Sequence, residues 1–126
     1  MSHRRLLIGL LLVGILQGCF VGNQAVPPPQ AGPPPLKVSF RKSQVPFHGL
    51  VAGINNPTDQ TIQVVAVLVQ DAADAHPRTH RLDYELKSLD TMTVGWTELD
   101  GWKLKSKDKL TIRCEGFTQD FQIIVE

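Results

Sequence analysis

The sequence predicts an all-β fold, a single small antiparallel β-sandwich that follows a leader and a proline-rich linker. Three observations predict it. From residue 36 onward, apolar side chains recur mostly at every second position, which is the period of strands with one buried face. Clusters of Gly, Pro, Asn and Asp interrupt these runs, and no stretch shows a convincing helical period. About seven short strands at such spacing favour two sheets packed face to face.

Residues 1–18 are typical of a secretory signal peptide. Arg4 and Arg5 provide a basic start, and the run 6–16 is apolar throughout. A membrane-spanning helix needs about 20 apolar residues, and this run is much shorter. We therefore expect the segment to be cleaved and not to remain as an anchor.

The residues around Cys19 resemble the cleavage motif of bacterial lipoproteins. Leu16 matches the apolar position three before the cysteine and Gly18 the small residue before it, whereas Gln17 departs from the usual small residue. The resemblance implies cleavage before Cys19, a diacylglycerol on its thiol and a further acyl chain, such as palmitate, on the new amino group. Two or more acyl chains hold a protein firmly on a membrane. The alternative is an ordinary secretory leader followed by a chance cysteine.

The residue after the cysteine bears on location. In the lipoprotein sorting pattern an aspartate there retains the protein at the inner membrane, and this chain has Phe20. The resemblance therefore implies an extracytoplasmic protein, held on the periplasmic side of the outer membrane where the host has two membranes.

Residues 19–35 comprise the lipidated cysteine and a proline-rich linker. Two proline triplets, 27–29 and 33–35, favour an extended polyproline II conformation at about 3.1 Å per residue. Fully extended, the linker would reach roughly 50 Å. A spacer that holds the domain away from the membrane explains this composition; the alternative is a proline-rich ligand.

The domain, residues 36–126, opens with three predicted strands. Leu36, Val38 and Phe40 alternate with polar residues, and segment 47–54 leads into a turn over 55–59. The run 61–70 is the most β-prone and is apolar on both faces. One face carries Ile62, Val64, Ala66 and Leu68, and the other carries Val65, Val67 and Val69. Such a strand either lies centrally with both faces covered or uses the valine face to dock a partner.

The remaining chain continues the strand pattern. Segment 71–78 is polar and predicts a loop or one short helical turn, and Asp100-Gly101 is a turn signal. Four more strands are expected over residues 80–86, 91–97, 109–115 and 117–125.

The segment 53–58, Gly-Ile-Asn-Asn-Pro-Thr, is followed by Ile62, Val64 and Val67 and by a later strand over 89–96. Together these residues resemble the FxLYD-type and related immunoglobulin-like domains of bacterial envelope lipoproteins. The FxLYD signature itself is absent, because no phenylalanine precedes the nearest candidate at 82–84. The resemblance implies an immunoglobulin-like sandwich that serves as a binding or spacer module without catalysis.

The composition argues against nucleic-acid binding and against a fold held by disulfides. Two of the 13 Lys and Arg residues, Arg4 and Arg5, precede Cys19, so the cleaved chain keeps 11 against 12 Asp and Glu. Binding of nucleic acid would require a strongly basic face. With Cys19 lipidated, Cys114 has no intrachain partner, so no disulfide framework is expected.

No catalytic, metal or cofactor site is predicted. His76 and His80 stand four apart near Asp71 and Asp74, a spacing that suits a metal on a helix but covers about 13 Å on a strand. Cys114 shares a predicted strand face with apolar residues and has no neighbouring base, so we expect a core thiol. No nucleophile elbow or phosphate-binding glycine loop occurs, and we expect no enzyme activity.

Two binding surfaces are candidates. One is the valine face of Val65, Val67 and Val69. The other is Trp102 with an alternating lysine row, which in an extended chain would project its ammonium groups to one side. The row consists of Lys103, Lys105, Lys107 and Lys109. It could meet anionic lipids or wall polymers, or it could protect a sheet edge from aggregation.

Two functions follow from these surfaces. The first is a membrane-anchored module that binds another envelope protein or supports it structurally. The alternative is a module that binds carbohydrate or an anionic wall polymer through Trp102 and the lysines. Trp96 and Trp102 are both expected in the core. The alternative is that only one of them is, and the exposed ring of the other could then stack on a sugar.

Overall fold

Seven strands and no helix make up the part of the chain that the structure, a computed structural model, describes: residues 28–74 and 76–126. The predicted signal peptide, Cys19 and the first part of the linker lie outside these residues. The strands are β1 (Lys37–Lys42), β2 (Leu50–Asn55), β3 (Ile62–Gln70), β4 (Arg78–Leu86), β5 (Thr91–Val94), β6 (Lys109–Cys114) and β7 (Phe121–Ile124). Within the described ranges, no helix has the length and apolar character needed to cross a membrane.

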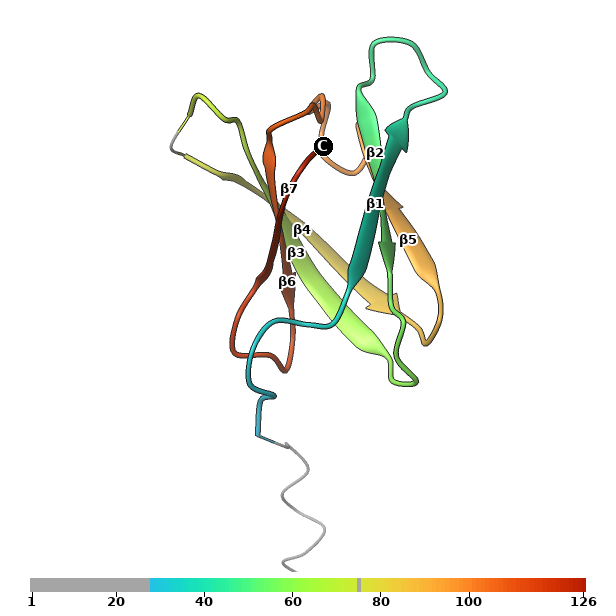
Figure 1. Cartoon of the computed structure of the whole chain (residues 1–126), viewed down its shortest axis with the longest axis vertical. Coiled ribbons are helices and arrows are strands. Elements are labelled where there is room, and N and C mark those ends of the chain that lie inside the picture. The colour runs from blue at the N-terminus through green and yellow to red at the C-terminus, as the bar shows by residue number, and fades with distance from the viewer. Residues whose placement is uncertain (1–27, 75) are drawn as a thin grey trace, which may run out of the picture.

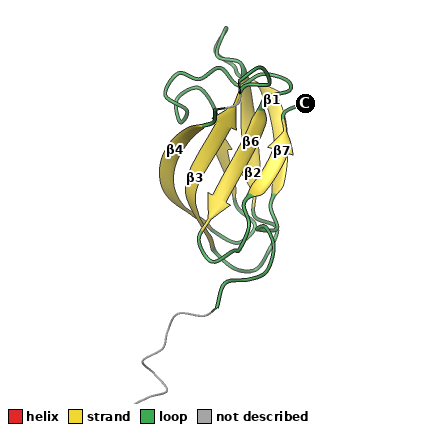
Figure 2. Ribbon diagram, turned by 90° about the vertical axis from the view of Figure 1, so that its left-hand side faces the viewer, coloured by secondary structure: helices red, strands yellow, loops and turns green. Residues whose placement is uncertain are grey.

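The strands form two antiparallel sheets that face each other (Figures 1 and 2). One has the order β1-β2-β5, and the other has the order β4-β3-β6-β7. The chain changes sheet after β2, β4 and β5, as it does in immunoglobulin-like sandwiches. β4 pairs with β3 in the larger sheet, where a variable-type domain places its C′ strand. The predicted all-β sandwich of about seven strands is confirmed.

The core lies between the sheets and is almost entirely aliphatic. Strands of both sheets contribute fully buried side chains, and so do the segments that flank β6. The fully buried aliphatic side chains are Ala52, Ile54, Val64, Val67, Val69, Leu86, Val94, Leu99, Leu104, Leu110, Ile112 and Val125. Burial alternates from Val51 to Asn55 in β2 and along β7, because a strand directs successive side chains to opposite sides.

A β-bulge at Val65 interrupts the alternation in β3. Val64 pairs with Cys114 of β6 and Ala66 with the next residue, Arg113, so Val65 is an extra residue without a partner in β6. On the other side of β3, two residues of β4 oppose Val65. Asp83, one of those two, has left-handed backbone with φ 49°, which aspartate tolerates better than most residues. The bulge shifts which side chains point inward over the rest of the strand.

The predicted valine face is therefore wrong. Beyond the bulge, Val67 and Val69 are 0% exposed and belong to the core, whereas Leu68 is only half buried. Val65, the bulged residue, is half buried and is separated from them. Of the two alternatives for this strand, the central position is the one observed: β3 lies between β4 and β6, and Val67 and Val69 pack in the core.

The predicted strand 91–97 ends at Val94. From Gly95 the chain turns. The amide of Leu99 donates to the Gly95 carbonyl at 3.0 Å, and the amide of Gly101 donates to the Trp96 carbonyl at 2.9 Å. Asp100 and Gly101 both have positive φ, at 51° and 81°, in agreement with the turn predicted there. Trp96 consequently lies in a turn and not in a strand.

The linker joins the domain earlier than its predicted boundary at Leu36. The amide of Gln30 donates to the Gly116 carbonyl at 2.8 Å, and the amide of Thr118 donates back to the Gln30 carbonyl at 3.0 Å. The Gly32 amide donates to the hydroxyl of Thr118 at 2.8 Å. These hydrogen bonds hold residues 30–32 against the β6–β7 connection.

The sandwich has two distinct ends (Figure 1). We call the end that receives residues 28–36, together with the connections β2–β3, β4–β5 and β6–β7, the linker end. The opposite end carries the β1–β2 connection, residues 71–74 and the chain between β5 and β6; we call it the Phe47 end.

Candidate functional site

The most exposed aromatic side chain of the described chain lies at the Phe47 end. Phe47, in the β1–β2 connection, is 85% exposed, and Val45 beside it is 51% exposed. The backbone at Phe47 has φ 69°, a left-handed conformation that is unfavourable for an aromatic residue. Both features cost free energy in the isolated protein. Such strain and apolar exposure concentrate at sites that bind something.

Backbone hydrogen bonds hold this connection in shape. The Ser43 amide donates to the Gly49 carbonyl at 2.9 Å, which closes the loop at its base. The Leu50 amide donates to the Leu104 carbonyl at 2.8 Å, and Gly49 forms an isolated bridge with Leu104. The loop is therefore attached to the segment that precedes β6.

A groove of about 570 Å³ lies between the β1–β2 connection and segment 103–106. Its lining is mainly apolar, with lysines and one glutamate. The lining residues include Lys42, Val45, Pro46, Phe47, Leu50, Lys103, Leu104, Lys105 and Glu126. We call this feature the Phe47 groove. It combines an apolar surface with positive charge.

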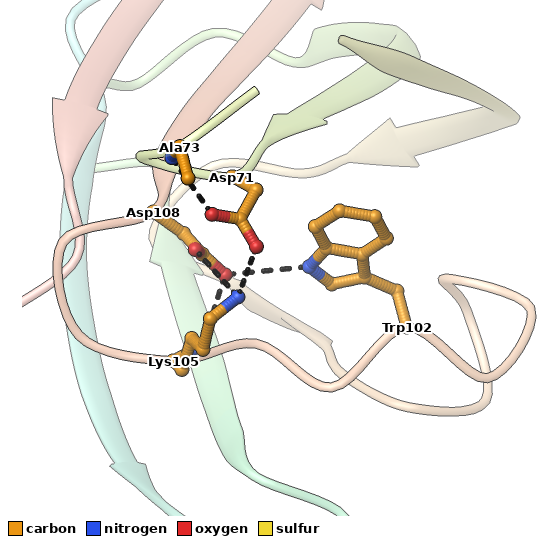
Figure 3. Close-up of polar contacts among 5 residues, drawn as sticks. All are labelled: Asp71, Ala73, Trp102, Lys105 and Asp108. Carbon is orange, nitrogen blue, oxygen red and sulfur yellow. Dashed lines mark hydrogen bonds and ion pairs between the residues drawn. The ribbon is translucent and has the colours of Figure 1, made fainter. Parts of the chain in front are cut away.

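Trp102, the predicted stacking residue, lies nearby but is already engaged (Figure 3). Its ring is half buried and packs against the core, and its Nε1 donates to Asp108 Oδ2 at 3.3 Å. The Arg78 guanidinium lies 4.8 Å from the ring centroid, and Lys105 Nζ lies 5.6 Å from it. These cation–π contacts occupy surface that a sugar would need.

Asp108 links Trp102 to the groove wall. This carboxylate is 0% exposed and accepts hydrogen bonds from Trp102 Nε1 and, at 3.1 Å, from the backbone amide of Lys105. Its other oxygen lies 3.2 Å from Lys105 Nζ. A buried carboxylate is tolerated when it is paired and hydrogen-bonded in this way.

Lys105 extends the network to Asp71. Its Nζ donates to Asp71 Oδ2 at 2.7 Å (Figure 3). The Ala73 backbone amide, which donates to Asp71 Oδ1 at 2.9 Å, is the main cause that lowers the pKa of Asp71, and Lys105 lowers it further. The bond to Asp71 in turn raises the pKa of Lys105. The network joins the start of the β3–β4 connection to segment 103–106.

The predicted lysine row is not continuous. A turn at Ser106-Lys107, where Lys107 has φ 76°, interrupts the extended chain, and only Lys109 lies in a strand. Lys103 and Lys105 line the Phe47 groove. Lys107 is exposed in the turn itself, and Lys109 is half buried. Of the predicted surface, the part around residues 103–105 remains available for binding.

Trp96 is likewise half buried, and its ring stacks on His48 with centroids 4.4 Å apart and an interplanar angle of 6°. His48 belongs to the β1–β2 connection. The stacked pair therefore joins the connection to the turn that follows β5. Neither tryptophan is fully buried, and each contacts a cationic or imidazole side chain.

The remaining residues considered in the sequence analysis are His76, His80 and Cys114. The His76 ring pairs with Asp74 at 3.3 Å, and the His80 ring pairs with Asp100 at 3.4 Å. Across 28–74 and 76–126, no three His, Cys, Asp or Glu side chains are grouped so that they could hold a metal. Cys114 is buried as predicted, and burial raises the pKa of its thiol to about 12, so it stays protonated at neutral pH.

Sequence reasoning missed the β1–β2 connection altogether. Residues 43–46 do not alternate, so they resemble an ordinary loop, and the predicted strand 47–54 begins only at Leu50. The available signal was Pro46-Phe47, an aromatic residue in a segment whose neighbours favour turns. Its exposure depends on the fold, because a phenylalanine in a loop usually packs back onto the core.

Comparisons of the chain with models of protein families, with curated proteins and with solved structures found no match.

Proposed function

We propose that this chain is a bacterial lipoprotein, anchored to a membrane through acylated Cys19, whose β-sandwich binds another protein of the cell envelope through its Phe47 end. The role is binding without catalysis. The observation that carries the proposal is the apolar loop tip at Phe47, which is 85% exposed and has left-handed backbone. Leu89 at the linker end shares the exposure and the backbone conformation, but Phe47 also lines the groove of about 570 Å³. A partner bound there would cover an apolar surface larger than one side chain.

The geometry of the tether supports this orientation. Gln30 and Gly32 are hydrogen-bonded to the β6–β7 connection at the linker end. A lipid on Cys19 would then lie on the linker side, and the Phe47 end would point away from that membrane (Figure 1). Such an arrangement presents the groove to proteins that approach from the envelope space.

Binding of carbohydrate or a wall polymer has less support. The ring of Trp102 is contacted by Arg78 and Lys105, and the lysine row is broken at Lys107. Lys105 is also paired with two aspartates, which reduces the positive charge available to a polymer. The remaining exposed lysines do not form the continuous row that would favour a polyanion.

The anchor is tested by replacing Cys19 with serine in the full chain. We expect the leader to remain uncleaved and the acylation to be lost, measured by the mass of the chain and by acyl labelling. Cys114→Ala, which removes the other cysteine, is the matched control and keeps both properties. Normal processing and acylation of the Cys19→Ser chain would contradict the proposal.

The binding end is tested by photo-crosslinking in intact cells. A benzophenone amino acid replaces Phe47 in one full-length variant and Leu89 in another. Leu89 is a matched control because it is 74% exposed and has φ 61°, but lies in the β4–β5 connection at the linker end. We expect a discrete protein adduct from position 47 and none from position 89. Equal adducts from both positions, or none from position 47, would count against the proposed end.

A further inference from the structure

We propose that the Phe47 groove receives an acidic segment of the partner, with an apolar side chain in the groove and flanking carboxylates paired to Lys42 and Lys103. This inference rests on the proposed function and deepens it, because it specifies the chemistry of the partner segment.

The apolar part of the argument comes from the lining. Val45, Pro46 and Phe47 lie on the β1–β2 connection, and Leu50 and Leu104 lie on the segments to which the connection is attached. The groove has a volume of about 570 Å³ and is open to solvent, so a side chain of a partner can reach it. An apolar side chain placed there would cover much of the exposed Phe47.

The charged part comes from the lysines. Three lysines line the groove against the single glutamate, Glu126. Lys105 is committed to Asp71 and Asp108, whereas Lys42 and Lys103 make no ion pair with any residue that the structure describes. Two ammonium groups without acidic partners beside an apolar surface favour carboxylates and repel a basic segment.

The groove is formed before any partner binds. Gly49 and Leu50 are bonded to Leu104 on one side, and the Asp71–Lys105–Asp108 network holds segment 103–106 on the other. Trp102 adds a hydrogen bond to the same network (Figure 3). Because these walls are already ordered, binding loses little conformational entropy.

Anionic lipid headgroups could also pair with lysines, but the position of the groove favours a protein segment. The groove lies at the end of the sandwich opposite residues 28–36, whereas a membrane that holds Cys19 would lie on the side of those residues (Figure 1). The partner is therefore an acidic, apolar segment of a protein.

The test uses the full chain with the benzophenone residue at position 47, illuminated in intact cells, and reads the cross-linked segment by mass spectrometry. We expect the adduct on a protein, at an apolar residue with Asp or Glu within about three positions on either side, the reach of neighbouring side chains in an extended segment. In the Lys42→Glu/Lys103→Glu background the adduct yield should fall at least about tenfold, because like charges would face each other.

The matched control for charge is Lys37→Glu/Lys87→Glu, which reverses two exposed lysines at the linker end and should leave the yield unchanged. A protein adduct whose segment lacks acidic residues, or whose yield falls equally in both lysine pairs, overturns this inference and leaves the proposed function standing. Adducts with lipid alone overturn it in favour of a bilayer contact. Absence of any adduct from position 47 overturns both proposals.

Discussion

Gly49 and Leu104, 55 positions apart in the sequence numbering, are in backbone contact, and a Cβ added at Gly49 would lie 2.5 Å from the Leu104 carbonyl oxygen. Gly49 also has φ 77°, a conformation that side chains disfavour. The contact attaches the loop of Phe47 to the segment that carries Lys103 and Lys105. The groove therefore requires glycine at position 49.

Gly49→Ala should lower the free energy of unfolding by on the order of 3 kcal/mol, because it adds a backbone clash to the left-handed strain. Gly116→Ala is the matched control: Gly116 has φ 88°, but nothing lies within 4 Å of its added Cβ, so we expect about 1–2 kcal/mol. Urea unfolding followed by tryptophan fluorescence measures both. Equal losses would show that the contact with Leu104 relaxes at no cost.

Asn56 is expected to be the most sensitive polar residue of the linker end. It is fully buried, and its amide donates to the carbonyls of Gln60 at 2.6 Å and Leu86 at 3.0 Å, while its Oδ1 accepts from Thr58. Asn56→Ala leaves these groups without partners and should cost on the order of 3 kcal/mol.

The neighbouring asparagine provides the control for this prediction. Asn55 is half buried and donates to Thr91 Oγ1 at 3.0 Å, so Asn55→Ala should cost about 1 kcal/mol. The difference between the two variants in urea midpoint measures the buried network. A loss at Asn56 no larger than at Asn55 would contradict the role assigned to burial.

Phe47→Asn should raise stability while it weakens binding. Asparagine adopts left-handed backbone more readily than phenylalanine and exposes less apolar surface, so we expect a gain of about 0.5–1 kcal/mol. Thermal unfolding measures the gain, and photo-crosslinking from position 45 measures the loss of partner. Phe117→Asn, at a half-buried position in contact with the core, should instead be destabilising. A Phe47→Asn protein that is less stable would show that the side chain supports the fold.

The Asp71 carboxylate should make stability depend on pH in the acid range. Its pKa is lowered in the folded protein, so its stabilisation is present above its ordinary value of 3.8 and is lost as the pH falls through the lowered pKa. Urea midpoints of the parent and of Asp71→Asn should therefore differ at neutral pH and converge in strong acid. Because the Ala73 amide is the larger cause, part of the difference should persist in a Lys105→Gln background. A difference that stays constant with pH would contradict this account.

The sequence by itself determined the class of fold and most strand positions. Alternation of apolar and polar residues at period two is a local property, and it follows directly from the way a strand directs its side chains. The turn at Asp100-Gly101 and the burial of Cys114 were predictable for similar reasons, since backbone preference and strand face are both set within a few residues.

Only the tertiary structure decided which surface is open. The bulge at Val65 arises from pairing with β4 and β6 at once, so no pattern within β3 could show that Val67 and Val69 turn inward. The regular spacing of the lysines predicted a row. In the structure a turn interrupts it, and the Lys107 amide donates to the carbonyl of Val125, the residue after β7. The Phe47 groove brings residues 42–50 against residues 103–106, and contacts between segments so far apart depend on the packing of two sheets, which local sequence does not specify.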